Sequence, residues 1–157
     1  MVRMNAEALF TRSVPIAQSI ERLLGGAASS IDCALYRLGN ANLARSLCEA
    51  ASRGVRVRVV LDRGKVLEGL SQPALLSGSL LSFRLSSGRS GVKSKMHHKF
   101  AVLDRRLVLT GSYNWSEESE EENYENLVIL GDPVLGEAYV REFESLWKQA
   151  SDADVRS

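Results

Sequence analysis

The sequence predicts an α/β sandwich in which a mixed central sheet carries helices on both faces. Its 157 residues are enough for one domain with a hydrophobic core, and no repeat or long linker divides residues 1–157, so we expect a single domain. A strand–helix–strand pattern over residues 30–62 indicates a parallel βαβ unit. Two apolar segments around a short turn at residues 104–106 indicate an antiparallel hairpin. A sheet with both kinds of pairing is mixed.

The first half of the chain alternates strands with amphipathic helices. Gly25-Gly26 and Gly54 are expected to end the two helices, because glycine favours the conformation found just beyond a helix C-terminus. In order, the expected elements are a strand at 7–10, a helix that begins at Ser13 as its N-cap, with Pro15 in its first turn, and ends at Gly25-Gly26, a strand at 30–38, a helix from Asn40 to the residue before Gly54, and a strand at 55–62.

The second half is richer in strands and closes with a long helix. Asp132-Pro133 is a helix start, and apolar residues then recur at helical spacing as far as Trp147. The elements expected before it are a short helix near 73–76, a strand at 81–86, a flexible basic loop at 86–95, a hairpin formed by 99–104 and 106–112, a solvated acidic loop at 117–122, and a strand at 125–130.

Composition places the chain among ordinary globular proteins. Hydrophobic residues make up 45% and charged residues 25% of the sequence, which excludes disordered, collagen-like and coiled-coil chains. Cys33 and Cys48 are too few for a disulfide framework, and we expect buried thiols. The sequence has no apolar run long enough to span a membrane and no signal-peptide core at its start. We therefore expect a cytoplasmic protein, although a targeting segment removed earlier would leave no trace.

Side chains that transfer protons or bind phosphate are concentrated in the apolar stretch MHHKFAVLDRRLVLTGSYNW. Side chains two apart on a strand share a face, so we expect His97 and Lys99 to point one way and His98 the other. Ser112 and Asn114 leave the second strand of the hairpin together, and both arms meet at one end of the sheet. An imidazole, an ammonium, a hydroxyl and an amide together suit a phosphate group.

These residues resemble the signature of the phospholipase D superfamily, H-x-K followed by D and then by G-S-x-N. Every position of the signature is present: His97, Lys99, Asp104, Gly111, Ser112 and Asn114. The resemblance continues with Glu125-Asn126 at the start of the next strand and with EFESLWKQ, residues 142–149, in the closing helix. It covers nearly the whole chain and implies the phospholipase D-like α/β/α sandwich.

Within this family the sequence is similar to the short, single-motif bacterial endonucleases of the Nuc type. It is also similar to their mitochondrial relatives of the Zucchini type, which have been described both as nucleases and as cardiolipin hydrolases. Two features differ from the Zucchini type. That type has an N-terminal membrane anchor, which this sequence lacks, and some of its members insert a Cys/His zinc site, which two cysteines cannot supply.

The chemistry of a phosphodiester predicts how these residues act. A neutral His97 imidazole can attack phosphorus and form a phosphohistidine, which water later cleaves. The leaving oxygen needs a proton from the opposite side, where the same imidazole cannot stand and where His98 does not point. A twofold homodimer that brings a second His97 across the axis solves this, and the family resemblance implies the same arrangement.

The remaining site residues have separate expected roles. Lys99 balances charge on the non-bridging oxygens, Asn114 donates a hydrogen bond to them, and Ser112 orients phosphate or imidazole. Glu125 is expected to hold the other His97 ring nitrogen and so to fix its tautomer. Asp104, at the hairpin turn, is interpreted as structural. No metal and no other cofactor is expected, because lysine and imidazolium supply the positive charge.

Substrate and partners follow from charge, although the formal net charge is only +1. Arg89, Lys93 and Lys95 directly precede the histidines, and we expect them to contact a nucleic acid backbone rather than to be ordinary solvated residues. Trp115 suits base stacking and core packing equally. The expected function is metal-independent cleavage of DNA or RNA. The alternatives are a phospholipase or cardiolipin hydrolase with the same chemistry, and a nucleic-acid-binding module without catalysis.

Overall fold

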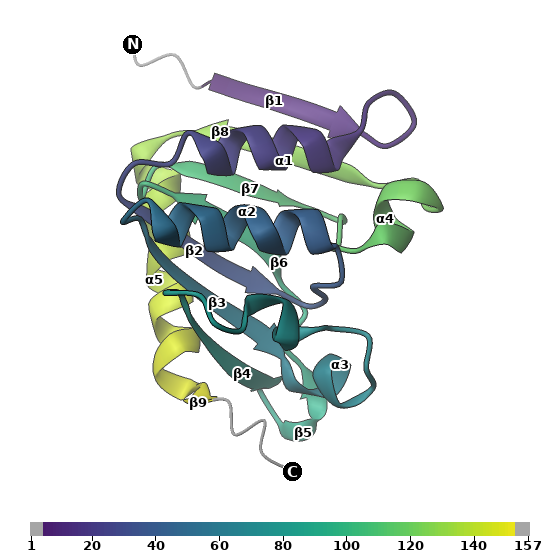
Figure 1. Cartoon of the computed structure of the whole chain (residues 1–157), viewed down its shortest axis with the longest axis vertical. Helices are drawn as coiled ribbons and strands as arrows, with labels where there is room; N and C mark the ends of the chain where they lie inside the picture. The colour runs from purple at the N-terminus through teal and green to yellow at the C-terminus, as the bar shows by residue number, and fades with distance from the viewer. Residues whose placement is uncertain (1–4, 153–157) are drawn as a thin grey trace.

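Nine strands form one mixed sheet in the computed structural model, which describes residues 5–152 (Figure 1). Their order across the sheet is β1-β8-β7-β6-β2-β3-β4-β5, and β9 pairs with β4. The strands are β1 (Asn5–Phe10), β2 (Ser30–Leu35), β3 (Arg56–Asp62), β4 (Ser82–Gly88), β5 (Gly91–Lys95), β6 (Lys99–Leu103), β7 (Leu107–Gly111), β8 (Asn126–Gly131) and β9 (Ser151–Asp152).

The pairing of these strands confirms the predicted mixed sheet. β2, β3 and β4 run parallel to one another, as the βαβ pattern predicts. β6 and β7 form the predicted antiparallel hairpin, and the remaining pairs are also antiparallel. β2 lies between β3 and β6, so the parallel and antiparallel halves of the sheet meet there.

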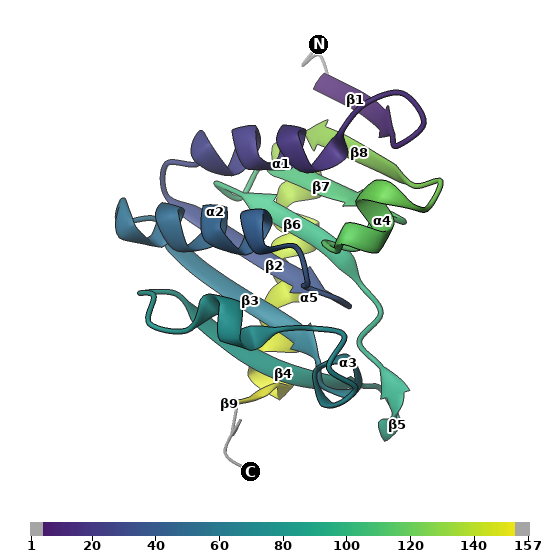
Figure 2. The same ribbon diagram turned by 45° about the vertical axis from the view of Figure 1, so that its right-hand side comes forward.

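Helices cover both faces of the sheet, as predicted. α1 (Ile16–Gly25) and α2 (Ala41–Ser52) lie side by side on one face, and α5 (Pro133–Gln149) crosses the other (Figures 1 and 2). The side chain of Asn40 accepts hydrogen bonds from two backbone N–H groups at the start of α2, and that of Asp132 does the same for α5.

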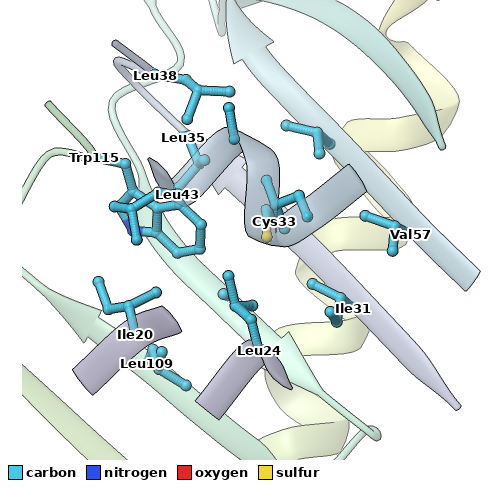
Figure 3. Close-up of a cluster of buried hydrophobic side chains, with 14 of the residues drawn as sticks. Ile20, Leu24, Ile31, Cys33, Leu35, Leu38, Leu43, Val57, Leu109 and Trp115 are labelled. Carbon is cyan, nitrogen blue, oxygen red and sulfur yellow. The ribbon is translucent and has the colours of Figure 1, made fainter. Parts of the chain in front are cut away.

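The core has two layers because strand side chains alternate between the faces. On β6, Ala101 and Leu103 pack into the layer beneath α1 and α2, whereas Phe100 and Val102 pack with Val140 and other residues of α5. Figure 3 shows part of the larger layer, in which Trp115 lies among leucine and isoleucine side chains. The hydrophobic residues of the stretch 96–115 are therefore core residues on both faces of the sheet, while the polar residues of this stretch lie at the strand ends.

The structure corrects the prediction of a flexible loop at residues 86–95. β4 continues to Gly88 and β5 returns antiparallel to it, so this basic segment is a hairpin. The Ser94 hydroxyl accepts a hydrogen bond from the Ser90 N–H and donates one to the Gly91 carbonyl, which closes the turn. The loop between β4 and β5 is thereby held by its own side chains.

Other elements also differ from the prediction. The acidic segment predicted as a loop contains a short helix, α4 (Glu117–Glu121), because the Ser116 side chain caps its N-terminus and acidic residues there suit the helix dipole. A short helix that the sequence pattern did not predict, α3 (Arg63–Leu67), follows β3, and the predicted turn of helix is a 3₁₀ segment, η1 (Pro73–Leu76). Within residues 5–152, no helix is long and apolar enough to cross a bilayer.

Candidate active site

Several strand ends meet at one edge of the sheet and bring the polar signature residues of the two strands of the hairpin together. β6 begins at Lys99, opposite Leu35 at the end of β2. β7 ends at Gly111, opposite Leu127 near the start of β8. Because β6 pairs antiparallel with both β2 and β7, the segments around His97, Ser112 and Glu125 lie at the same edge. Figure 2 shows this edge on the side of α4 and β5.

His97 is held between a lysine and a tyrosine. Its Nδ1 atom lies 3.3 Å from the Lys99 Nζ atom, which also donates to the His97 carbonyl at 3.1 Å. The ring of Tyr36 packs against the imidazole with a centroid separation of 4.3 Å, and the Tyr36 N–H donates to the carbonyl of His98 at 2.8 Å. The buried tyrosine therefore fixes both the backbone and the ring of this segment.

The electrostatic surroundings favour a neutral imidazole. Partial burial lowers the pKa of His97, and the positive charges of Lys99 and then Lys95 lower it further. Partial burial also lowers the pKa of Lys99, against the opposing influence of the Glu125 carboxylate. These influences favour the neutral imidazole, which is the form in which a histidine can act as a nucleophile.

The second arm is organised around Glu125. One carboxylate oxygen accepts a hydrogen bond from the Ser112 hydroxyl, and the other accepts from the Ser119 hydroxyl at 3.3 Å and from the Asn123 side-chain amide at 3.2 Å. The Asn114 N–H donates to Ser119 at 3.2 Å, and the Asn114 side-chain oxygen is buried without a hydrogen-bond partner among residues 5–152. These contacts join the end of β7 to the start of β8.

The predicted contact between Glu125 and His97 is not made in this structure. Neither oxygen of Glu125 bonds to the imidazole in the part of the chain that the structure describes, and His97 Nδ1 faces Lys99 instead. The Glu125 carboxylate lies close enough to Lys99 to influence its pKa. The carboxylate is therefore in the same site as His97 but is occupied by donors from its own arm.

Asp104 lies at the opposite end of β6 from the site. Its carboxylate accepts hydrogen bonds from the N–H groups of Ala28, Ser29 and Ser30 and from the Ser29 hydroxyl, at 2.7–3.2 Å. Burial opposes ionisation, but these donors hold the pKa of Asp104 below its ordinary value. The structure places this residue where it connects the hairpin turn to the start of β2.

Gly111 stands where β7 approaches β8 too closely for a side chain. A Cβ atom at this position would lie 2.3 Å from the backbone oxygen of Asn126. Ser112 and Glu125 flank this contact on the two strands, so the glycine allows the two strand ends, and their polar side chains, to approach each other.

The basic residues predicted to contact nucleic acid lie on the β4–β5 hairpin and are exposed. Arg89 and Lys95 line a cleft of about 450 Å³ together with His97, His98 and residues of α5. Lys93 lies on β5 outside the residues that line the cleft. The hairpin thus extends a positively charged surface away from the histidine.

Two neighbours of the signature have structural roles. His98 turns away from His97: its Nε2 atom lies 3.1 Å from the Glu142 carboxylate, and its ring meets Phe100 edge-on. Trp115 is only 1% exposed and packs in the core, so it is not available to stack on a base. Of the two interpretations that the sequence left open for Trp115, core packing is correct.

Sequence reasoning missed Tyr36, Asp62 and Lys65. Asp62 is buried at the end of β3 and its carboxylate accepts from the Met96 N–H and the Lys65 N–H, both at 2.9 Å. Tyr36 directly follows the end of β2. The available signal was position, because polar residues at the carboxyl ends of neighbouring parallel strands share one edge of a sheet.

Metal-binding groups are not clustered in the described structure. Within residues 5–152, no three His, Cys, Asp or Glu side chains come together in a way that could hold a metal ion. Cys33 is a buried thiol, as predicted, whereas Cys48 is only partly buried.

Comparison with known proteins relates the sequence to one family. The family described as "Cardiolipin synthase, PLD-like domain" matches residues 20–147. The mitochondrial cardiolipin hydrolase of Xenopus laevis is 37% identical over 128 residues, which cover 82% of this chain and 59% of that protein. The protein of the same name from Homo sapiens is 35% identical, covering 82% and 49%. The chain thus spans about half to three-fifths of the length of these relatives.

Solved structures share the fold over nearly the whole chain. Nuc from Salmonella typhimurium, a phospholipase D family member, superposes with a TM-score of 0.86 and 24% identity, covering 96% of this chain and 98% of that one. NucT from Helicobacter pylori superposes with a TM-score of 0.85 and 21% identity, covering 96% and 99%. At these identities the likeness establishes the fold.

Proposed function

The chain belongs to the phospholipase D-like family, and we propose that it hydrolyses phosphodiester bonds of DNA or RNA without a metal, through a phosphohistidine. The observation that carries this proposal is the pairing of His97 with Lys99, with their atoms 3.3 Å apart, beside the Tyr36 ring. This pairing presents a neutral imidazole and a cation to the same anion. A phosphate needs both, one to attack it and one to balance its charge.

The reaction proceeds in two displacements. The His97 imidazole attacks phosphorus, an N–P bond forms, and the P–O bond to the leaving oxygen breaks. A second imidazolium, on the far side, gives its proton to that oxygen. Now neutral, it takes a proton from water, which attacks phosphorus and breaks the N–P bond. Lys99 and the side-chain amide of Asn114 hold the non-bridging oxygens throughout.

The second imidazolium belongs to another copy of the chain in this proposal. Each chain has two histidines, and His98 faces Glu142 on the other side of the strand. A twofold dimer that opposes two His97 rings supplies one attacker and one proton donor.

The reaction needs no metal in this proposal, because the side chains of the two subunits supply the positive charge. Two lysines and an imidazolium face one phosphodiester, so the charge on the non-bridging oxygens is balanced without a divalent ion. We therefore expect turnover to persist in excess EDTA.

Nucleic acid is the favoured substrate because the basic hairpin adjoins His97. Arg89 and Lys95 line one cleft with His97, His98 and residues of α5, and exposed cations next to His97 suit a polyanionic backbone. Binding that depends on these residues should weaken steeply with salt, because phosphate contacts release counterions.

A cardiolipin hydrolase is the second candidate function. The specific observation in its favour is that relatives 35–37% identical to this chain carry that name. The chemistry would be the same, since cardiolipin is also a phosphodiester. The two candidates differ in the groups that flank the reacting phosphate.

A substrate panel in EDTA tests the proposal. Single-stranded DNA, double-stranded DNA, RNA and cardiolipin vesicles are each incubated with wild-type protein and with the His97→Ala variant. We expect cleavage of nucleic acid by the wild type alone. Lipid turnover with intact nucleic acid would establish the second candidate, and binding of DNA without any cleavage would indicate a non-catalytic binding module.

A further inference from the structure

We propose that Lys65 forms a second phosphate-binding point, which takes the phosphate next to the reacting one on a nucleic acid strand. This inference rests on the proposed function and adds a residue outside the family signature. Lys65 lies on α3, at the same edge of the sheet as His97, because α3 directly follows β3 and β3 neighbours β2.

The geometry centres on Tyr36. The Lys99 Nζ atom lies 5.1 Å and the Lys65 Nζ atom 5.4 Å from the centroid of the Tyr36 ring, and both distances allow a cation–π interaction. The two nitrogen atoms can therefore be no farther apart than the sum of these distances. His97 packs against the same ring. The Tyr36 ring is thus in contact with the His97 imidazole and with the ammonium groups of Lys99 and Lys65.

The position of Lys65 is fixed by the same group that positions His97. Asp62 is 2% exposed, and one of its oxygens accepts from the Lys65 N–H while the other accepts from the Met96 N–H. Met96 immediately precedes His97. A shift of α3 would therefore disturb the segment that carries the nucleophile, so the spacing between Lys65 and the reactive phosphate is held by a buried carboxylate.

Lys65 is paired in the free protein, but its partner is replaceable. Its Nζ atom donates to the Glu68 carboxylate at 2.5 Å, and the side chains of Lys65 and Glu68 are 16% and 54% exposed, so Glu68 lies on the solvent side of the pair. That hydrogen bond raises the pKa of Lys65, and contact with the Tyr36 hydroxyl raises it further against the effect of desolvation. Ion pairs with an exposed carboxylate contribute little, so a phosphate can displace Glu68 from the ammonium group.

Comparing two substrates distinguishes binding of a neighbouring phosphate by Lys65 from a general effect of the substitution on the active site. Bis(p-nitrophenyl) phosphate has one phosphodiester, whereas a short single-stranded oligonucleotide has neighbouring phosphates. We expect Lys65→Gln to lower kcat/KM for the oligonucleotide about tenfold, since one lost charge-assisted contact corresponds to roughly that factor, and to lower hydrolysis of the single diester by about twofold at most. Lys65→Arg should restore most of the loss.

Glu68→Gln provides a test of opposite sign. Removing the competing carboxylate should raise kcat/KM for the oligonucleotide about twofold to threefold, because Lys65 is then free for the substrate. Lys148→Gln, which removes an exposed lysine from α5, is the matched control and should change neither substrate. Equal losses on both substrates with Lys65→Gln, or no loss on the oligonucleotide, would overturn the assignment.

Binding of a fluorescently labelled oligonucleotide, followed by anisotropy, keeps this inference separate from the proposed function. A wild-type protein that binds the oligonucleotide and loses about tenfold in affinity on Lys65→Gln, yet hydrolyses neither substrate, would support the second phosphate point and refute the phosphodiesterase proposal. Turnover of cardiolipin but not of the oligonucleotide would overturn the nucleic acid assignment of Lys65. Thermal unfolding of each variant checks that α3 remains folded.

Discussion

Replacing Asp104 should lower the stability of the fold and leave the rate of the catalysed reaction unchanged, because Asp104 lies at the end of β6 opposite the candidate active site. Its carboxylate accepts hydrogen bonds from three consecutive backbone N–H groups and one hydroxyl at the start of β2. Only the bond from Ser30 is partly buried, so we assign about 1.5 kcal/mol to it and about 0.5 kcal/mol to each of the exposed bonds. Asp104 also has a φ of 53°, where alanine costs about 1 kcal/mol more than aspartate. Asp104→Ala should therefore cost about 4 kcal/mol.

Thermal and chemical unfolding measure this loss. For a chain of this size, about 4 kcal/mol corresponds to a fall in Tm of roughly 8–16 °C. Asp104→Asn is the matched control, because asparagine tolerates the same φ and keeps one acceptor oxygen, and it should lose about half as much. Unfolding free energies for both variants within about 0.5 kcal/mol of wild type would refute the reasoning. Turnover below the unfolding temperature should be unchanged.

The pH dependence of the stability difference between wild type and Asp104→Asn tests the direction of the pKa shift. The folded-state pKa of Asp104 is depressed, so its stabilising contribution is fully present above the unfolded carboxyl pKa of about 3.9. That contribution is lost as the pH falls through the lower folded-state pKa. The stability gap between wild type and Asp104→Asn should therefore be constant from neutral pH down to about pH 5 and narrow below about pH 4. A gap that widens on acidification would contradict this assignment.

Two further predictions concern the site. Gly111→Ala should lower the unfolding free energy measured by chemical denaturation by about 1–3 kcal/mol and should reduce turnover, because the new Cβ would meet the Asn126 backbone and push β7 away from β8. A variant with wild-type stability and activity would contradict the close approach of the two strands. Lys95→Gln should move the acidic limb of the pH–rate profile to higher pH, because Lys95 lowers the pKa of His97. Lys93→Gln is the control and should leave that limb in place. If Lys95→Gln also leaves it in place, Lys95 does not act on the imidazole.

The sequence predicted most of the fold because its periodic patterns were long. The β2–α2–β3 unit and α5 have clear apolar spacing and glycine, asparagine or aspartate at their ends, and they formed as expected. The β5 hairpin was missed because its stability depends on hydrogen bonds made by Ser94 within a segment that reads as polar and basic. α4 was missed because a helix this short depends on its Ser116 cap rather than on periodicity.

The candidate site was predicted where residues carry chemistry and missed where they support it. The signature identifies His97 and Lys99, and strand alternation separates them from His98. Tyr36 and Asp62 come from strands distant in the sequence, and their contacts with the segment around His97 depend on the order of β2, β3 and β6 in the sheet. Their positions at the ends of β2 and β3 indicate a shared edge of the sheet, but no local pattern encodes the strand order that brings β6 beside β2, so the contacts themselves are visible only in the tertiary structure.

A heterodimer with a single His97 tests the shared site most directly. Two differently tagged chains, one wild type and one His97→Ala, are co-expressed, and the heterodimer is isolated by both tags and assayed on an oligonucleotide in EDTA. Loss of the only proton donor opposite the remaining imidazole should reduce turnover to about 1% of wild type or less. A heterodimer that retains half of the wild-type rate would show that each chain works alone and would contradict the account.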